Sequence, residues 1–274
     1  MEVKDRRVAI AGLGTVGRAV AEAIDSDLSG DLSGYRLAAV ASGRADRARD
    51  FVDGLRSGVA VVSAQELATH ADLVIECAPP TVFREIAAPA IQQGRQLVVL
   101  SVGALLGSWD LVDHAQNTGA EVLVPTGALL GLDAVQAAAL GTVRSVRMVT
   151  RKPLGGLAGA PYLTDRGMTL ANVREPVRLF RGSAREAVNG FPANLNVAVA
   201  LSLAGIGPDR TEVEVWADPT VVRNTHRIDV DADSVRFSLA IENVPSENPR
   251  TGRITALSVV ALLRKLASPL KVGT

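Results

Sequence analysis

The sequence of 274 residues contains a single cysteine, Cys77, and few aromatic side chains, which make up 3% of the chain. One cysteine excludes an intrachain disulfide and a metal centre built from several thiolates. So few aromatic residues argue against a stacking surface for single-stranded nucleic acid. Basic and acidic residues balance at 29 each, so no bulk charge attracts nucleic acid or an anionic membrane.

Long apolar runs are missing as well. No uninterrupted run reaches the roughly 18 residues expected of a membrane span. The first residues, MEVKDRRVAIAG, carry charge without the apolar stretch and cleavage site of a secretory signal. No group of histidine, cysteine and carboxylate residues has metal-ligand spacing, so no metal is expected. These features predict a cytoplasmic protein that binds neither membrane nor nucleic acid.

Short apolar runs alternate with segments of helical length over the first half of the chain. The runs are RRVAIAGLG, YRLAAVAS, GVAVVS, DLVIECAPP, QLVVLSVG and AEVLVPTG. Nearly continuous apolar strands that alternate with helices are typical of a parallel sheet covered on both faces. We therefore predict an α/β fold with a doubly wound, Rossmann-type domain over residues 1–127. The tandem repeat DLSGDLSG is interpreted as a surface loop.

A different pattern begins after residue 141. Four segments alternate apolar with polar residues, namely VRSVRMVTR, TEVEVWAD, HRIDVDA and SVRFSLAIENV. They predict an antiparallel or mixed sheet with one solvated or dimer-forming face. One helix, NLNVAVALSLAG, is expected between them, ending at Gly205. We predict an α+β domain for catalysis and dimerisation over residues 128–245.

The C-terminal segment is expected to form a helix that returns to the first domain. Its apolar positions recur with the spacing of a helix; they are Ile254, Leu257, Val260, Ala261 and Leu263. The dinucleotide-binding domain would then comprise residues 1–127 and 246–274.

The stretch AGLGTVG carries Gly12, Gly14 and Gly17 in the spacing G-x-G-x-x-G. It follows a predicted strand and opens a predicted helix, the context that separates a phosphate-binding loop from a merely structural turn. Gly12 permits the tight turn, Gly14 lets the backbone approach a pyrophosphate, and Gly17 allows close packing of helix on strand. The candidate cofactor-binding loop comprises Gly12, Leu13, Gly14, Thr15, Val16 and Gly17.

The end of the second predicted strand separates the two nicotinamide cofactors. An acid there would bind the ribose 2′-hydroxyl of NAD. The sequence instead reads VASGRADR, with Ser42 and Arg44 and no acid before Asp46. Arg44 suits a 2′-phosphate, although a solvated loop arginine is the alternative interpretation. We expect NADP as cofactor, with NAD as the other candidate. Ala78, directly after the fourth predicted strand, is a further candidate contact.

Longer blocks follow the glycine loop in a fixed order. They are PTGALLGLDAV, RKP, FRGSAREAVNGFPANLNVAVALSLAGIG, ADPTVVRNTH and PSENPRTGRITALS. Together with the loop they resemble the L-aspartate dehydrogenase family over essentially the whole chain. The resemblance implies an NAD(P)-dependent enzyme that oxidises L-aspartate to iminoaspartate. The imine hydrolyses to oxaloacetate and ammonia, or it feeds pyridine-nucleotide biosynthesis.

The resemblance also implies roles for single residues. The family's active-site histidine matches His226, and its dinucleotide contacts outside the glycine loop match Ala128 and Asn196. A histidine pKa of about 6.5 suits the proton transfers of amine oxidation. The alternative is a surface histidine at the edge of a strand. Asn194 is expected to cap its helix, which would place Asn196 in the first turn.

A dicarboxylate substrate needs cationic partners. The candidates in or beside the family blocks are Arg151, Lys152, Arg223 and Arg227, each with a solvated face as the alternative. The other reactive side chains receive structural interpretations. Cys77 is taken as a small buried hydrophobe, and His70 and His114 as structural or exposed.

The sequence departs from the family pattern at Leu129, Leu130 and Leu154. Another amino acid or a cyclic imine therefore stays open as the substrate. A dinucleotide-binding sensor without turnover is the alternative from a different class of protein. A homodimer formed through a face of the second sheet is expected.

Overall fold

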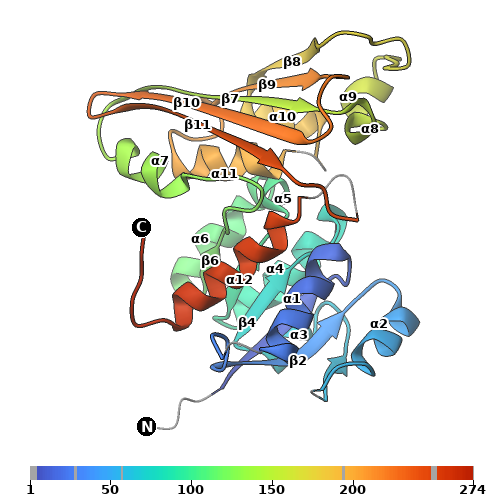
Figure 1. Cartoon of the computed structure of the whole chain (residues 1–274). Coiled ribbons are helices and arrows are strands. Elements are labelled where there is room, and N and C mark those ends of the chain that lie inside the picture. Colours follow the sequence, from blue (N-terminus) through green and yellow to red (C-terminus); the bar gives the residue numbers. More distant parts are fainter. Residues whose placement is uncertain (1–4, 28–29, 57, 193–194, 248–251, 274) are drawn as a thin grey trace. The chain divides into compact units, whose positions relative to one another are not determined.

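The computed structural model describes residues 5–27, 30–56, 58–192, 195–247 and 252–273. The chain divides into two compact units (Figure 1). Unit 1 comprises Met1–Pro125 and Ala256–Val272, and unit 2 comprises Thr126–Thr255 and Gly273–Thr274.

Unit 1 contains a six-stranded sheet in the order β3-β2-β1-β4-β5-β6, and all its strands are parallel. The strands are β1 (Arg6–Ala11), β2 (Tyr35–Ala41), β3 (Ala60–Val61), β4 (Leu73–Glu76), β5 (Gln96–Val99) and β6 (Glu121–Leu123). This order is that of a doubly wound Rossmann fold, which confirms the predicted fold class. The strand order reverses between β1 and β4: strands β2 and β3 are added on one side of β1, and strands β4 to β6 on the other. Ligands of such folds bind outside the carboxyl ends of the strands at this switch point.

Helices connect the parallel strands of unit 1 because each crossover must return to the same edge of the sheet. They are α1 (Thr15–Ser26), α2 (Ala45–Val52), α3 (Leu67–His70), η1 (Pro80–Val82), α4 (Phe83–Gln92), α5 (Val102–Leu106) and α6 (Trp109–Thr118). The sequence GVAVVS gives only the two-residue strand β3, shorter than its apolar run suggested.

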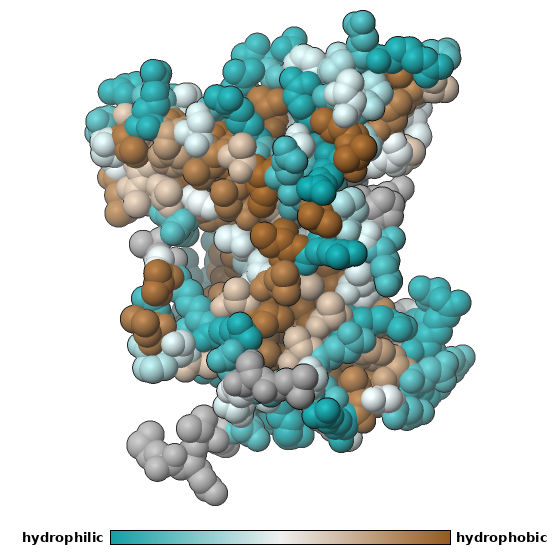
Figure 2. Space-filling model, in the orientation of Figure 1, coloured by the Kyte–Doolittle hydropathy of each residue, from teal (hydrophilic) through white to brown (hydrophobic). Residues whose placement is uncertain are grey.

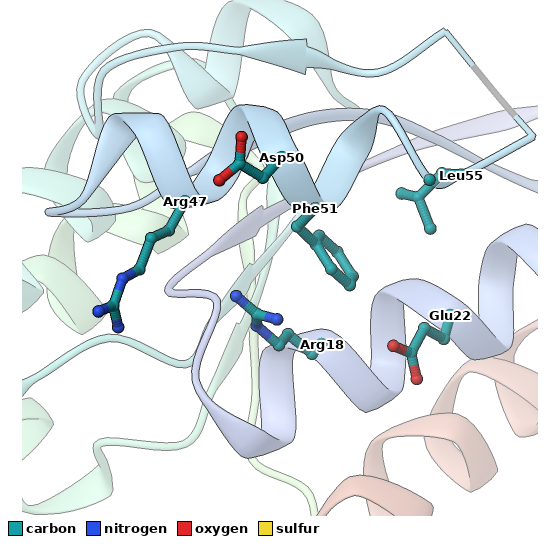
Figure 3. A pocket seen from close by; sticks show the side chains of 7 residues that line it. Arg18, Glu22, Arg47, Asp50, Phe51 and Leu55 are labelled. Carbon is teal, nitrogen blue, oxygen red and sulfur yellow. The ribbon is translucent and has the colours of Figure 1, made fainter.

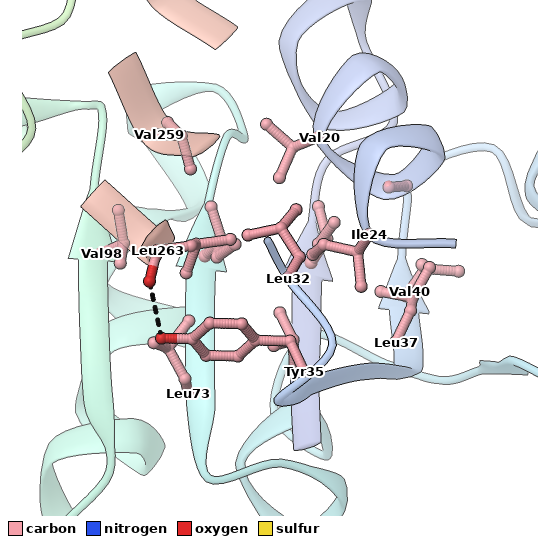
Figure 4. Close-up of a cluster of buried hydrophobic side chains, with 14 of the residues drawn as sticks. Val20, Ile24, Leu32, Tyr35, Leu37, Val40, Leu73, Val98, Val259 and Leu263 are labelled. Carbon is pink, nitrogen blue, oxygen red and sulfur yellow. Dashed lines mark hydrogen bonds between the residues drawn. The ribbon is translucent and has the colours of Figure 1, made fainter. Parts of the chain in front are cut away.

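The C-terminal helix α12 (Ile254–Ala267) packs against the core of unit 1. Val259 and Leu263 are its fully buried residues and join the apolar cluster of β1, β2 and β4 (Figure 4). The helical spacing placed Ile254, Leu257 and Ala261 on one apolar face, but all three are exposed, Leu257 by 64%, so that part of the prediction was wrong. The core takes the face one position further round the helix. Within the same cluster, the Tyr35 hydroxyl donates a hydrogen bond of 3.0 Å to the Leu263 carbonyl oxygen.

Unit 2 contains a five-stranded sheet in the order β11-β10-β7-β9-β8. Its strands are β7 (Val143–Lys152), β8 (Val177–Ser183), β9 (Glu212–Ala217), β10 (Asn224–Ala232) and β11 (Arg236–Asn243). The sheet is mixed, because β7 and β9 run parallel while the other neighbours are antiparallel. An all-antiparallel sheet is therefore ruled out. Strand β8 overlaps the start of a family block and carries no clear alternation, so it was not predicted.

Helices in unit 2 lie mainly along one face of this sheet (Figure 1). They are α7 (Leu132–Ala139), α8 (Leu154–Leu157), α9 (Pro161–Thr164), α10 (Ala184–Gly190) and α11 (Asn196–Ala204). Helix α10 begins with a capping box, in which Ser183 and Glu186 satisfy each other's backbone N–H groups. Helix α11 has Gly205 as its C-cap, the position at which the sequence predicted its end.

The inner face of the second sheet changes character along its strands. Val146 and Met148 of β7 and Ile228 and Val230 of β10 are buried apolar residues on this face. The next inward positions are Thr150 and Lys152 on β7 and His226 on β10, which are also buried. One end of an apolar face is therefore polar.

In the part of the chain that the structure describes, no helix has the length and apolar character needed to cross a membrane.

Replacing Tyr35 by phenylalanine is expected to lower the free energy of unfolding by about 1 kcal/mol, since one buried hydrogen bond to the Leu263 carbonyl oxygen is lost. Urea unfolding of the two proteins measures the difference. Tyr162→Phe is the control, because no hydrogen bond of the Tyr162 hydroxyl occurs among the described residues. Equal stability of Tyr35→Phe and wild type would show that this bond does not hold α12.

Candidate active site

The glycine-rich loop connects β1 to α1 at the carboxyl edge of the first sheet. Gly14 occupies the N-cap position of α1, and no side chain caps the helix there. The first backbone N–H groups of α1 are thus available to an anion, which the helix dipole also favours.

Each glycine of the loop has a different steric reason. A Cβ atom on Gly12, whose φ is +93°, would lie 2.6 Å from the Cys77 carbonyl oxygen. A Cβ atom on Gly17 would lie 1.9 Å from the Gly12 carbonyl oxygen. Gly14 has no protein atom within 4 Å of such a position, so the space beside it is open. The loop therefore fits a dinucleotide, whose pyrophosphate would approach Gly14.

Arg18, in the first turns of α1, supports this loop from behind. Its Nε atom donates a hydrogen bond of 3.1 Å to the Leu13 carbonyl oxygen. Its guanidinium carbon lies 4.9 Å from the centre of the Phe51 ring of α2 (Figure 3). Arg18 and Phe51 line a shallow groove between α1 and α2. The other residues that line it are Glu22, Arg47, Asp50, Gly54 and Leu55. Since the groove carries charges of both signs, it offers no single class of ligand a clear advantage.

The loop after β2 holds Ser42 and Arg44. The Ser42 hydroxyl accepts a hydrogen bond of 3.3 Å from the Arg44 backbone N–H, which shapes the turn into α2. Arg44 is exposed and forms no ion pair in the described structure. Hydrophilic residues gather over α2, at the lower right of Figure 2. An unpaired arginine beside the loop is compatible with a 2′-phosphate.

Cys77 and Ala78 follow β4 and face the glycine loop across the switch point. The Cys77 N–H donates to the Ala11 carbonyl oxygen at 2.8 Å, which fixes the two strand ends together. Burial raises the pKa of the Cys77 thiol. A thiol that resists ionisation is a poor nucleophile, which favours a structural role for this half-buried side chain.

His226 lies on β10 in unit 2 and is 3% exposed, so the interpretation as a surface histidine is wrong. Burial, and then the charge of Lys152, lower its pKa to about 3. The ring is therefore neutral at physiological pH. Its Nδ1 atom is buried without a hydrogen-bond partner among the described residues, a costly arrangement that points to a ligand.

Lys152, the last residue of β7, is also 3% exposed. Thr150 stands directly opposite His226 in the β7–β10 register, so Lys152 is the diagonal neighbour of His226 on the same face. Diagonal neighbours in an antiparallel pair lie about 7–8 Å apart. Burial lowers the pKa of Lys152 to about 8. No carboxylate among the described residues forms an ion pair with it. A buried, uncompensated ammonium group calls for an anion.

Two further polar side chains complete this end of the sheet. The Thr150 hydroxyl oxygen and the Asn243 amide oxygen are buried without hydrogen-bond partners in the described structure. The Asn243 amide nitrogen donates a hydrogen bond of 3.0 Å to the Ala128 carbonyl oxygen. Asn243 is the other diagonal neighbour of His226, since Ile241 stands opposite that residue. Ala128 is thus brought to the polar end that holds His226.

The remaining cationic candidates lie elsewhere in unit 2. Arg151 pairs with Asp218 at 3.1 Å and stacks on Trp216, on the face opposite to Lys152. Arg227 pairs with Asp229, and Arg223 is exposed. Of the four cations that the sequence suggested, Lys152 is the one beside His226.

Other suggested residues are less informative. Asn196 is the first residue of α11 and half-buried, whereas Asn194 lies outside the described residues. His70 and His114 are exposed on α3 and α6. Within the described ranges, no group of three or more histidine, cysteine or acidic side chains could hold a metal ion.

Thr150 and Asn243 were missed in the sequence, although a signal was present. Both occupy inward positions of alternating strands, where Thr150 follows Val146 and Met148 at steps of two residues. A polar residue at a position that the alternation assigns to the core marks a functional or strained place.

The comparisons with known proteins agree with the class of protein that this fold and its glycine loop define, a dinucleotide-dependent oxidoreductase. Residues 12–125 match the NAD-binding domain of homoserine dehydrogenase, and residues 133–266 match the C-terminal domain of aspartate dehydrogenase. The chain belongs to the aspartate dehydrogenase family, and NAD or NADP is its cofactor.

Relatives cover nearly the full length of the chain. The sequence is 56% identical to L-aspartate dehydrogenase from Bradyrhizobium diazoefficiens, over 98% of this chain and 94% of that protein. It is 53% identical to L-aspartate dehydrogenase 3 from Bordetella bronchiseptica, over 97% of both chains. The crystal structure of aspartate dehydrogenase from Thermotoga maritima has the same fold, with a TM-score of 0.75 and 23% identity over 98% of this chain and 99% of that one.

Gly14→Ala is expected to leave the fold intact and to weaken NADH or NADPH binding about tenfold or more, because the methyl group would fill the approach of the pyrophosphate. Alanine fits the backbone there, since φ is −78°. Fluorescence titration with the reduced cofactor measures the affinity, and thermal unfolding measures the fold. Gly58→Ala, another open glycine of unit 1, is the control. Unchanged affinity in Gly14→Ala would place the pyrophosphate elsewhere.

Proposed function

We propose that this protein oxidises L-aspartate with NAD+ or NADP+ to iminoaspartate, and that water then converts the imine to oxaloacetate and ammonia. The observation that carries the assignment of residues is the buried pair of Lys152 and His226. A neutral base beside an unpaired cation suits a substrate with an ammonium group and two carboxylates. The names of the full-length relatives support the same substrate.

The glycine loop is proposed to hold the dinucleotide, with Ala78, Ala128 and Asn196 as further contacts. Ser42 and Arg44 would bind the adenosine ribose or its 2′-phosphate, and on this ground NADP is the proposed preference. When bound, the nicotinamide ring accepts the hydride that leaves the α-carbon. The protein's part is to hold that carbon in position and to exclude water until the imine has formed.

Lys152 is proposed to receive a substrate carboxylate. Its ammonium group lacks a carboxylate partner in the described structure and has already lost most of its contact with water. A charge-assisted hydrogen bond to an incoming carboxylate therefore gains more than it would at the surface, where water competes. Thr150 and Asn243 offer a hydroxyl and an amide oxygen to the polar groups of the same substrate.

His226 is proposed to accept the proton that the substrate ammonium group loses as the carbon–nitrogen double bond forms. In the free protein the pKa of His226 is about 3, lowered by burial and by the charge of Lys152. Two substrate carboxylates would offset the charge of Lys152 and raise the pKa of the imidazole. The histidine thus becomes a better base when aspartate is bound, and the protonated ring can return its proton during imine hydrolysis.

The setting of the reaction is also proposed. We infer a cytoplasmic homodimer that uses the outer face of the second sheet, and a role in supplying iminoaspartate for pyridine-nucleotide biosynthesis. That face carries cross-strand ion pairs such as Arg147–Glu214 and Arg181–Glu212, with Trp216 among them. A monomeric mass in light scattering would contradict the dimer.

His226→Ala is expected to lower kcat for aspartate about a hundredfold or more, since the proton acceptor is lost, while NADPH affinity stays the same. Initial rates of NAD+ and NADP+ reduction with L-aspartate measure kcat, and fluorescence titration measures the affinity. His114→Ala, which alters an exposed histidine, is the control. Unaltered turnover would remove His226 from the reaction. If the wild-type protein reduces neither cofactor with aspartate but reduces one with another amino acid, that amino acid is the substrate. If it shows no turnover with any amino acid, a dinucleotide-binding sensor is favoured.

Lys152→Met is expected to raise the KM for aspartate about tenfold to a hundredfold, because a charged hydrogen bond is lost. The pKa of Lys152 in the free protein is about 8, so its ammonium group is charged below that pH and loses its charge above it. Carboxylate binding favours the charged form, so the wild-type KM should rise with pH above about 8 and binding should take up protons there.

Steady-state kinetics as a function of pH, in several buffers, tests this expectation. Lys152→Met should lack the alkaline rise in KM. Arg227→Met removes a neighbouring cation from the opposite, exposed face and should leave KM unchanged. A KM of Lys152→Met equal to that of wild type would exclude Lys152 as the carboxylate partner.

A further inference from the structure

Glu76 is a carboxyl side chain buried inside unit 1 and unused by the reaction proposed above. It is the last residue of β4 and is 0% exposed. Its neighbours across the sheet are Ala11 and Val99, both apolar. No cation among the described residues forms an ion pair with it. An ionised carboxylate in such a place is costly unless hydrogen bonds fully compensate it.

The hydrogen bonds around Glu76 join two loops. Oε1 lies 3.0 Å from the Ala78 backbone nitrogen and 3.0 Å from the Ser101 hydroxyl. Oε2 accepts from the backbone N–H groups of Leu100, at 3.2 Å, and Ser101, at 2.9 Å. Ala78 belongs to the loop after β4, and the other two residues belong to the loop after β5. One side chain therefore sets the backbone of both.

The donors and acceptors of this cluster balance when Glu76 carries a proton. The Ser101 hydroxyl has one hydrogen but two acceptors within reach, Glu76 Oε1 and the Ala78 carbonyl oxygen at 3.0 Å. If Oε1 is protonated, it donates to Ser101 Oγ, and the Ser101 hydroxyl donates to Ala78. The proton thus supplies the one donor that the cluster lacks when Glu76 is ionised, and Oε1 can still accept from the Ala78 N–H. Burial raises the pKa of Glu76, in the same direction, although the hydrogen bonds oppose it.

The circuit, meaning the hydrogen bonds among Glu76, Ala78, Leu100 and Ser101, lies next to the proposed dinucleotide site. The loop after β4 lies at the switch point of the sheet, where the Cys77 carbonyl oxygen packs against Gly12 closely enough to exclude a Cβ atom. A displaced residue 77 or 78 would therefore alter the space beside the glycine loop. Cys77, whose thiol pKa would rise further next to an ionised Glu76, is the titratable residue that adjoins the circuit.

We propose that Glu76 is a positioning residue for the cofactor: as a neutral carboxylic acid it joins the loops after β4 and β5 and thereby holds Ala78 in place beside the dinucleotide. The inference rests on the dinucleotide site of the proposed function but not on the identity of the substrate. It assigns Glu76 no part in proton transfer to the substrate.

The test compares NADPH and NADH affinity with stability in four variants. Glu76→Ala removes the circuit and should weaken binding about tenfold. Glu76→Gln keeps the acceptor for the Leu100 and Ser101 N–H groups and the donor to Ser101 but loses the acceptor for the Ala78 N–H, so its affinity should fall between those of wild type and Glu76→Ala. Ser101→Ala should also lie between wild type and Glu76→Ala. Val99→Ala removes buried volume from the adjacent strand but none of the hydrogen-bonding groups around Glu76, and it should lose stability but keep its affinity.

Two readouts besides turnover decide the outcome. Fluorescence titration gives the cofactor affinity, and a difference infrared spectrum between wild type and Glu76→Gln should contain the carbonyl band of a protonated carboxylic acid. Wild-type affinity in Glu76→Ala, with a loss of stability like that of Val99→Ala, would overturn the positioning role. A carboxylate band would overturn the neutral form. If Glu76→Ala does not fold, Ser101→Ala alone decides, because an unchanged affinity there contradicts the circuit. The wild-type protein could prove inactive towards aspartate while its cofactor binding still depends on Glu76. That result would contradict the proposed substrate but support this inference.

Discussion

The uncompensated positive charge of Lys152, buried next to His226, is the constraint on which the chemistry of unit 2 depends. A lysine placed there without a partner lowers the stability of the free protein, since both its own charge and the basicity of the imidazole are suppressed. An apolar pair at these positions would pack at no such cost. The fold tolerates the cost because Val146, Met148, Ile228 and Val230 supply apolar burial on the same face. The dicarboxylate that we propose as the ligand of this polar end would offset the cost.

Unit 1 meets a different demand, which is steric. The turn at Gly12 presses against the carbonyl of Cys77, and Gly17 lets α1 pack on that turn. These contacts place the helix N-terminus and the end of β4 on the two sides of the switch point. Open space then remains beside Gly14. The six parallel strands, the core under α12 and the hydrogen bonds of Glu76 all hold this one small region still. The shape of the glycine loop therefore depends on buried residues outside the loop as well as on its own glycines.

The extent to which the sequence predicted these features depends on the range of the forces involved. Strands β1, β2, β4, β5 and β6 were recognised because apolar runs report burial on both faces of a parallel sheet. The dinucleotide fold followed from local spacing in the glycine loop. The parallel pairing of β7 with β9 was not predictable, since alternation reports which face is buried and is silent on the partner strand. For the same reason Leu257 was misplaced, as helical spacing defines a stripe but not the side that meets the core.

The candidate site shows the same limit more sharply. His226 emerged from a family block, and four cations stood beside it in the sequence without a means of choosing among them. The register of β7 and β10 makes that choice, because it places Lys152 on the face of His226 and Arg151 and Arg227 on the other. Yet the parity of the strands already contained the answer. Counting by twos from Met148 reaches Thr150 and Lys152, and counting from Ile228 reaches His226, so polar residues fall on a face that apolar residues define. Polar residues that break a core pattern at matching ends of two strands would identify such a site from sequence alone, provided that the two strands are known to be neighbours.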